Sequence, residues 1–251
     1  MAWAFAALAL PHAPLMNALA GQAMQKLSHF PAQSLAGTLW AFAAVVWQDR
    51  QVIGEISASV LSQAFALNPR HLAATVWSVA RCAFSPPSLA TAFAACSTRL
   101  HEFGPQELSN TAWSMAVLEF RDVPLLDAMS WRVQATMEEW KAQELANAAQ
   151  ASAVLQLVEK LLVRAAAARL PEKADWEPRH LSSTAWSLAM LMVEDRTILW
   201  RLARATPHAG HFGAQALANL VWSFAKLAFR DSQVLGALAP AVVDKLADFG
   251  A

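Results

Sequence analysis

The chain has 251 residues, of which 56% are hydrophobic and only 15% charged, and this composition excludes a disordered polypeptide. Its 19 basic and 19 acidic residues cancel, which excludes a polybasic tail for nucleic acid or a membrane surface. Two cysteines are too few for a disulfide framework or a four-thiolate zinc site, and the longest apolar run has ten residues, where a membrane span needs about 20.

A tryptophan recurs at a nearly constant interval along the chain. It stands in the segments AWAFAAL, TLWAFAAV, TVWSVARC, TAWSMAVL, TAWSLAML and LVWSFAKL, at Trp3, Trp40, Trp77, Trp113, Trp186 and Trp222. The spacings are 37, 37, 36, 73 and 36 residues, and the double interval contains a degenerate copy with Gln150 in place of tryptophan. We call these seven positions the anchors. Such a period predicts a repeat array, with units of approximately 1–30, 31–67, 68–103, 104–140, 141–176, 177–212 and 213–249.

Each unit is predicted to contain two helices. The first begins after proline or glycine, as in FPAQSLAGTLWAFAAVVW, where four apolar residues have the spacing of a buried helical stripe: Leu35, Leu39, Phe42 and Val46. The second begins near an acidic residue nine positions after the anchor, which can cap free backbone N–H groups: Asp49, Asp122, Glu159, Asp195 and Asp231. The second helix has an apolar stripe of its own, which in the last unit is Leu235, Leu238, Val242, Leu246 and Phe249.

A helical hairpin of 36–37 residues cannot bury its apolar face alone, so neighbouring hairpins must stack. The predicted fold class is therefore all-α, an α-solenoid of about seven helix-turn-helix repeats forming one array over residues 1–251. Neither end has a polar capping repeat, and Met1 falls two residues before an anchor. We therefore expect a segment of a longer array or a truncated gene model.

Winding the first helix at 100° per residue predicts an outward stripe at seven and three positions before the anchor and at one and four positions after it. Seven before the anchor stand Gln33, Arg70, Gln106, Gln143, Arg179 and Gln215. Three before it stand Gly37, Ala74, Asn110, Asn147, Ser183 and Asn219. The residue after the anchor is Ala or Ser, and the position four after it includes Arg81 and Lys226. We call the residues at seven before, three before and four after the anchor the ladder.

The ladder suits single-stranded RNA read at one base per repeat, because amides and hydroxyls can bond base edges and small neighbours let the ligand approach. The alternative is that the asparagines and serines only satisfy local hydrogen bonds near a helix start. The competing function is a protein-protein interaction scaffold of the armadillo or tetratricopeptide type. RNA binding predicts acids on the opposite side and a single cluster of Arg70, Arg81, Arg179 and Lys226, whereas a scaffold predicts a mixed or apolar lining.

Other patterns are interpreted as structural. The tryptophans invite base stacking, but their helical angle at the border of the buried face favours a role as core anchors. His208 and His211 are spaced like metal ligands but lack partners, and Ser223 and Lys226 match an S-x-x-K pattern only because Ser223 is the ordinary serine of the repeat. We therefore expect no enzyme, no cofactor, no metal site and no small-molecule substrate.

The segments FGPQELSNTAWSMAVLEFRD and FGAQALANLVWSFAKLAFRD resemble octotricopeptide and heptatricopeptide repeats of organelle proteins. The same hairpin pattern is similar to that of FAST-kinase-domain/RAP proteins and of repeat proteins of the kinetoplastid RNA-editing substrate-binding complex. The resemblance implies an α-solenoid that binds single-stranded organellar RNA through the ladder, with RNA-processing or ribonucleoprotein partners and no membrane. It implies a role in RNA processing, stability, editing or translation in a mitochondrion or plastid, although no targeting peptide is visible.

Overall fold

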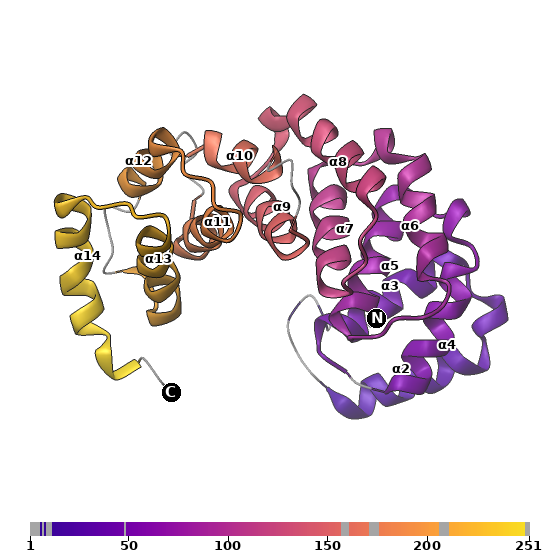
Figure 1. Ribbon diagram of the computed structural model, residues 1–251. Helices are drawn as coiled ribbons and strands as arrows, with labels where there is room; N and C mark the ends of the chain where they lie inside the picture. The colour runs from indigo at the N-terminus through magenta and orange to yellow at the C-terminus, as the bar shows by residue number, and fades with distance from the viewer. Residues whose placement is uncertain are drawn as a thin grey trace. The chain divides into compact units, whose positions relative to one another are not determined.

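The computed structural model describes residues 6, 8, 12–47, 49–156, 161–170, 176–205 and 211–248. Within these residues the chain is helical and contains no strand, and helices pack on their neighbours, so the predicted all-α solenoid is confirmed (Figure 1). The α-helices are α2 (Ala13–Gln25), α3 (Ala32–Ala44), α4 (Arg50–Leu61), α5 (Pro69–Arg81), α6 (Leu89–Thr98), α7 (Pro105–Val117), α8 (Val123–Ala135), α9 (Ala142–Val154), α10 (Leu161–Ala168), α11 (Pro178–Met190), α12 (Arg196–Arg204), α13 (Ala214–Lys226) and α14 (Ser232–Asp244). None of these helices has the length and apolar character needed to cross a bilayer.

The chain divides into two compact units, Met1–Arg132 and Val133–Ala251. In the first unit the anchor-bearing helices α3, α5 and α7 pack side by side, and in the second unit α9, α11 and α13 do the same. The second helices α4, α6, α10 and α14 pack on the first helices of their own hairpins, which are α3, α5, α9 and α13. Each unit therefore has a layer of first helices and a layer of second helices, while the single array over 1–251 stays a prediction.

The acidic residue nine positions after the anchor caps the second helix where the structure describes it. Oδ1 of Asp49 accepts from the backbone N–H groups of Gln51 and Val52 at 3.1 and 3.2 Å. The carboxylates of Asp122, Asp195 and Asp231 accept equivalent bonds. The predicted cap is thus confirmed at these four positions, and Glu159 lies outside the described residues.

Each first helix from α3 to α13 is followed by a residue with positive φ, six positions after the anchor and two after the last helical residue. These left-handed residues are Val46, Ala83, Glu119, Gln156, Met192 and Ala228, with φ between 49° and 56°. The next backbone N–H then bonds back to a carbonyl five residues earlier, as from Trp47 to Phe42 at 2.9 Å, which closes the helix end. The prediction that Val46 belongs to the buried stripe is wrong, because the turn leaves its side chain 52% exposed.

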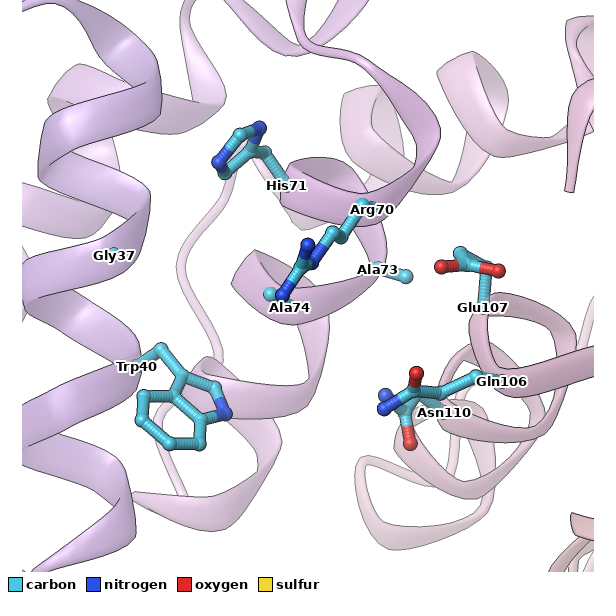
Figure 2. A pocket seen from close by; sticks show the side chains of 9 residues that line it. All are labelled: Gly37, Trp40, Arg70, His71, Ala73, Ala74, Gln106, Glu107 and Asn110. Carbon is cyan, nitrogen blue, oxygen red and sulfur yellow. The ribbon is translucent and has the colours of Figure 1, made fainter. Parts of the chain in front are cut away.

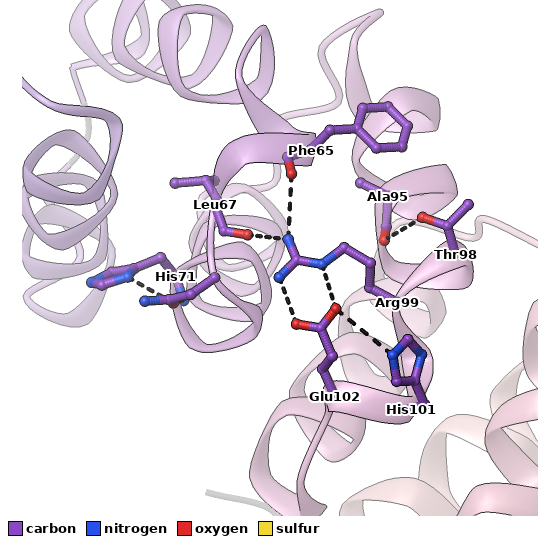
Figure 3. A network of polar contacts seen from close by, with 9 residues as sticks. Phe65, Leu67, His71, Ala95, Thr98, Arg99, His101 and Glu102 are labelled. Atoms are coloured by element: carbon purple, nitrogen blue, oxygen red, sulfur yellow. Dashed lines mark hydrogen bonds and ion pairs between the residues drawn. The ribbon is translucent and has the colours of Figure 1, made fainter.

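Arginines of the second helices tie successive repeats together. The guanidinium of Arg99 donates to the carbonyls of Leu67 and Phe65 in the preceding repeat and makes a two-pronged bond to Glu102, at 2.7 and 2.8 Å (Figure 3). Arg132 donates to the His101 carbonyl at 3.2 Å, and Arg201 donates to that of Ala168 at 2.8 Å. Each bond satisfies a carbonyl that a helix end or turn leaves free.

The second helix of the last unit buries less than expected. Leu238 of α14 is 2% exposed, whereas Leu235 and Leu246 are 40% and 60% exposed. The prediction of a fully buried stripe is therefore wrong for these two residues, and α13 is the α-helix against which α14 packs most extensively. Phe249, the last residue of that stripe, lies outside the described residues.

Candidate nucleic-acid interface

The ladder position seven before the anchor lies in the first turn of each first helix. Its side chain is exposed in all six repeats that the structure describes: Gln33, Arg70, Gln106, Gln143, Arg179 and Gln215. The position three before the anchor is one turn further along and half-buried in every repeat: Gly37, Ala74, Asn110, Asn147, Ser183 and Asn219. Burial therefore increases from the first turn to the second, whereas Arg81 and Lys226, four positions after the anchor, are exposed again.

The predicted stripe is wrong at one of its four positions. The residue directly after the anchor is not outward, since Ser78, Ser114, Ser187 and Ser223 are fully buried. Each of these hydroxyls donates to the backbone carbonyl of the ladder residue four positions earlier, at 2.5–2.7 Å. A first helix has neighbours on both flanks and beneath it, so only a narrow stripe remains open. Ser223, the serine of the S-x-x-K match, is thus committed to its own helix.

The anchor itself completes the open stripe. Spacings of four, three and four residues join the positions seven before, three before, zero and four after the anchor on one helical face. The indoles of Trp40, Trp77, Trp113 and Trp186 are half-buried, and Trp222 is 42% exposed. The tryptophan side chains therefore line the open stripe as well as packing in the core. The core-anchor interpretation did not anticipate the first of these roles.

In the first unit the tryptophans form a row. The ring centroids of Trp40 and Trp77 are 6.5 Å apart, those of Trp77 and Trp113 are 6.1 Å apart, and the planes are tilted by 32° and 34°. In the second unit Nζ of Lys226 lies 4.9 Å from the ring centroid of Trp222, which is a cation–π contact. Aromatic surface thus lies between the ladder positions three before and four after the anchor.

One pocket gathers five predicted ladder residues from three successive repeats. It has a volume of about 340 Å³ and is lined by Gly37, Trp40, Arg70, His71, Ala73, Ala74, Gln106, Glu107 and Asn110 (Figure 2). The predicted members are Gly37, Arg70, Ala74, Gln106 and Asn110. The sequence interpretation missed Trp40, His71, Ala73 and Glu107, although the helical spacing that selected Gly37 also selects Trp40.

The polar side chains of this pocket differ in whether they already make hydrogen bonds within the protein. Within the described residues, the side chains of Arg70, Gln106 and Asn110 have no hydrogen bond or ion pair with the protein. Glu107 is engaged, because its Oε2 accepts from the backbone N–H of Gly104 at 3.2 Å and caps α7. The pocket therefore offers one guanidinium and two amides to a ligand.

His71 stands at the rim of the pocket and is held by the cap of α5. Its Nδ1 lies 2.8 Å from Oδ1 of Asn68, which also accepts from the His71 backbone N–H at 2.9 Å. Partial burial, and secondly the charge of Arg70, lower the pKa of His71 below its ordinary value of 6.5. His71 is therefore neutral at pH 7, and Arg70 supplies the positive charge of the pocket.

The second unit carries the same pattern of residue types with different surroundings. Gln143, Arg179 and Gln215 repeat the Gln, Arg, Gln order of the first unit. Nε of Arg179, however, lies 2.9 Å from Oε2 of Glu177 in an ion pair. The corresponding residue in the first unit is Asn68, which leaves Arg70 without a carboxylate partner.

The predicted segregation of charge is wrong. Glu107 lines the same pocket as Arg70, and Glu177 pairs with Arg179, so acids occur on the ladder side. Arg70 and Arg81 are separated by eleven residues of α5, roughly 16 Å of helix, and so form no single cluster. The cause is the repeat itself, which places one ladder position at the start of the helix and another at its end.

No group of three or more His, Cys, Asp or Glu side chains that could hold a metal occurs in the parts of the chain that the structure describes. His211 is exposed, and His208 lies outside those parts. The chemistry available at the ladder is thus hydrogen bonding, aromatic contact and a few positive charges.

Comparison with protein families identifies the chain. Residues 1–176 match the model of the family described as RNA-editing substrate-binding complex 6 protein. The chain belongs to the RESC6 family. Family membership implies involvement in an RNA-editing complex and points to the mitochondrion, with no support for a plastid. The RESC6 match includes every residue of the pocket, and no curated protein matches the chain.

The predicted resemblance is thereby confirmed at the level of the RNA-editing substrate-binding complex. The narrower assignment to octotricopeptide or heptatricopeptide repeats stays a prediction. The RESC6 match ends two residues before α11, so the ladder residues of α11 and α13 lie beyond it.

Proposed function

We propose that this chain is a sequence-selective single-stranded RNA-binding subunit of a mitochondrial RNA-editing substrate-binding complex, without catalysis of its own. The observation that carries the proposal is the pocket of Figure 2, where Arg70, Gln106 and Asn110, whose side chains have no hydrogen bond or ion pair among the described residues, line the same space as a half-buried indole. Amides can bond base edges, an arginine can bind a phosphate, and an indole can stack on a base. Family membership supports RNA as the ligand.

The mechanism is binding by a repeated surface rather than by a single site. Each first helix presents one ladder side chain in its first turn and a second one turn later, and neighbouring helices pack in parallel within a unit. A strand that runs across the helices would meet a new pair of side chains in each repeat. Variation among Gly37, Ala74 and Asn110 on an otherwise constant framework then provides selectivity.

The experiment is a selection from a random RNA pool with the purified chain, followed by binding titrations over a salt series. A short single-stranded consensus with affinity that falls as salt rises supports the proposal. Arg70→Ala is expected to reduce the slope of log K against log salt by about 0.7, which is one phosphate contact on a single strand. The matched control is Arg50→Ala, because Arg50 is exposed at the start of α4 in the other layer.

Base reading is tested separately from charge. The double variant Asn110→Ala/Asn147→Ala is expected to change the selected consensus while the helical circular dichroism stays constant, because both side chains belong to the open stripe. Gln134→Ala removes an exposed amide from α8 and serves as the control. An unchanged consensus in the double variant would remove these two asparagines from base reading.

A protein-interaction scaffold is the second candidate, favoured by the mixed charge on the ladder side and by Trp200 of α12. Trp200 is 45% exposed and adjoins two pockets of about 360 and 190 Å³ on the second-helix side of its unit. Its ring meets that of Phe229 edge-on at 5.8 Å. If the selection yields no consensus and RNA binding does not depend on salt, the result would favour the protein-interaction scaffold over the RNA-binding function.

A further inference from the structure

The pocket between α3, α5 and α7 has the composition of a site for one base rather than of a uniform groove. Its lining includes Gly37 and Ala74, the two smallest ladder residues at the position three before the anchor. A Cβ atom added at Gly37 would meet no atom within 4 Å, so the space above this glycine is open. A volume of about 340 Å³ lies at the lower end of the range for pockets that enclose small ligands, so it suits a single nucleotide.

The polar and aromatic groups of the pocket lie on different sides of that space. Figure 2 shows the Trp40 indole on one side, the neighbouring amides of Gln106 and Asn110 on the other, and the Arg70 side chain between them. A base that stacks on the indole with one edge toward the amides would take the space in which Figure 2 shows the Arg70 side chain, so this side chain, which has no hydrogen bond or ion pair among the described residues, would turn toward the phosphate. Arg70 is then placed for the phosphate, since a guanidinium binds phosphate oxygens with its fork of donors.

The amides select among the bases by their donor and acceptor pattern. Asn and Gln each carry one donor group and one acceptor, which match the N6 amino group and the N7 acceptor of adenine. Guanine offers two acceptors at the same edge, and uracil and cytosine lack N7. The amides of Gln106 and Asn110 therefore fit the N6/N7 edge of adenine and not the same edge of guanine, whereas uracil and cytosine would have to bond through their Watson–Crick edges.

We propose that this pocket binds one adenosine nucleotide of the RNA, with the base packed on Trp40, its N6/N7 edge bonded by Asn110 and Gln106, and its phosphate at Arg70. This inference rests on the proposed RNA-binding function and assigns one nucleotide of the bound strand to a defined site. The pocket thereby specifies one base of the bound strand and fixes the register of the remaining repeats.

The test uses the full chain and synthetic seven-nucleotide RNAs with a single central adenosine in oligouridine. The same RNA with 7-deazaadenosine, which lacks the N7 acceptor, and all-uridine RNA are the matched probes. We expect the adenosine RNA to bind about tenfold more tightly than the other two, as expected for loss of one good base-edge contact. Asn110→Ala should reduce the affinity for adenosine RNA and leave that for the deaza RNA nearly unchanged.

Two further variants separate the pocket from the stability of the fold. Gly37→Leu fills the open space from a helical position where glycine is unfavourable, so the chain should fold at least as well and lose the adenosine preference. Gly21→Leu in α2 is the control, since Gly21 also has no atom within 4 Å of an added Cβ and lies outside the pocket. Trp40→Leu should weaken binding of adenosine RNA by about tenfold or more through lost stacking, whereas Trp40→Phe should retain part of it.

The outcomes are distinct. Equal affinity for the adenosine, deaza and uridine RNAs, or an adenosine preference that survives Gly37→Leu, overturns this inference while salt-dependent RNA binding preserves the proposed function. Absence of binding to any RNA, including the selected pool, overturns the proposed function and this inference together.

Discussion

The triplets α3–α5–α7 and α9–α11–α13 carry the same Gln, Arg, Gln order at the first level of the ladder, yet their surroundings differ. In the first triplet Gly37, Ala74 and Trp40 stand where the second has Asn147, Ser183 and Gln150. Within the residues that the structure describes, Arg70 of the first triplet has no hydrogen bond or ion pair, whereas Arg179 of the second pairs with Glu177.

A ladder residue therefore acquires its chemistry from its neighbours. Small residues at the second level open space beneath Arg70, and the anchor of the preceding repeat provides an aromatic wall. The residue that caps the arginine's own helix, Asn68 or Glu177, determines whether the guanidinium is free to bind a ligand or is held in an ion pair. One residue type at one repeat position can therefore be a binding group in one unit and an ion-pair partner in the other.

The largest expected effect concerns the anchors. Trp77→Ala should lower the free energy of unfolding by about 3 kcal/mol, because the indole packs in its own repeat and meets two other indoles. Trp186→Ala should cost about 1 kcal/mol less, because the preceding anchor is Gln150 and offers no ring. Urea unfolding of both variants measures the difference, and equal losses would show that the row adds no stability.

A second pair of variants exchanges the partners of the arginines. Asn68→Glu should give Arg70 the carboxylate that Arg179 has and weaken RNA binding by about fivefold, which is the magnitude of an exposed ion pair. Glu177→Asn should release Arg179 and strengthen binding by a similar factor. Titrations at low salt are the measurement. If both variants bind like the parent, the arginines do not contact phosphate.

The smallest effect is a dependence of stability on pH through His71. Since the folded chain holds the pKa of His71 below 6.5, the unfolded chain takes up a proton first as the pH falls. Stability should therefore decline between pH 6.5 and the lowered folded pKa, and His71→Gln should remove this contribution. Urea unfolding of both chains from pH 7.5 to pH 5 measures it, and identical pH profiles would contradict the assignment.

The sequence predicts the period, the helix pairs and the aspartate caps, because each rests on a local and repeated signal. It also predicts that the position seven before the anchor is exposed, but not that the position three before it is half-buried, because that burial comes from the neighbouring helices. The burial of Ser78 and its equivalents was missed because one helix considered alone has no flanking neighbours. The left-handed residues carry no glycine, so Ala83 and Glu119 gave no signal, and the pairing of Arg179 depends on a side-chain orientation that spacing does not contain.

The interrepeat arginines have a consequence for how the molecule comes apart. A carbonyl of the preceding repeat accepts a hydrogen bond from each of the three arginines Arg99, Arg132 and Arg201. When one hairpin unfolds, the hairpin before it therefore loses a charged hydrogen-bond donor. Such nearest-neighbour coupling spreads unfolding over adjacent repeats instead of confining it to one. Each unit should consequently unfold cooperatively, because the stability of every hairpin depends on whether the neighbouring hairpins are folded.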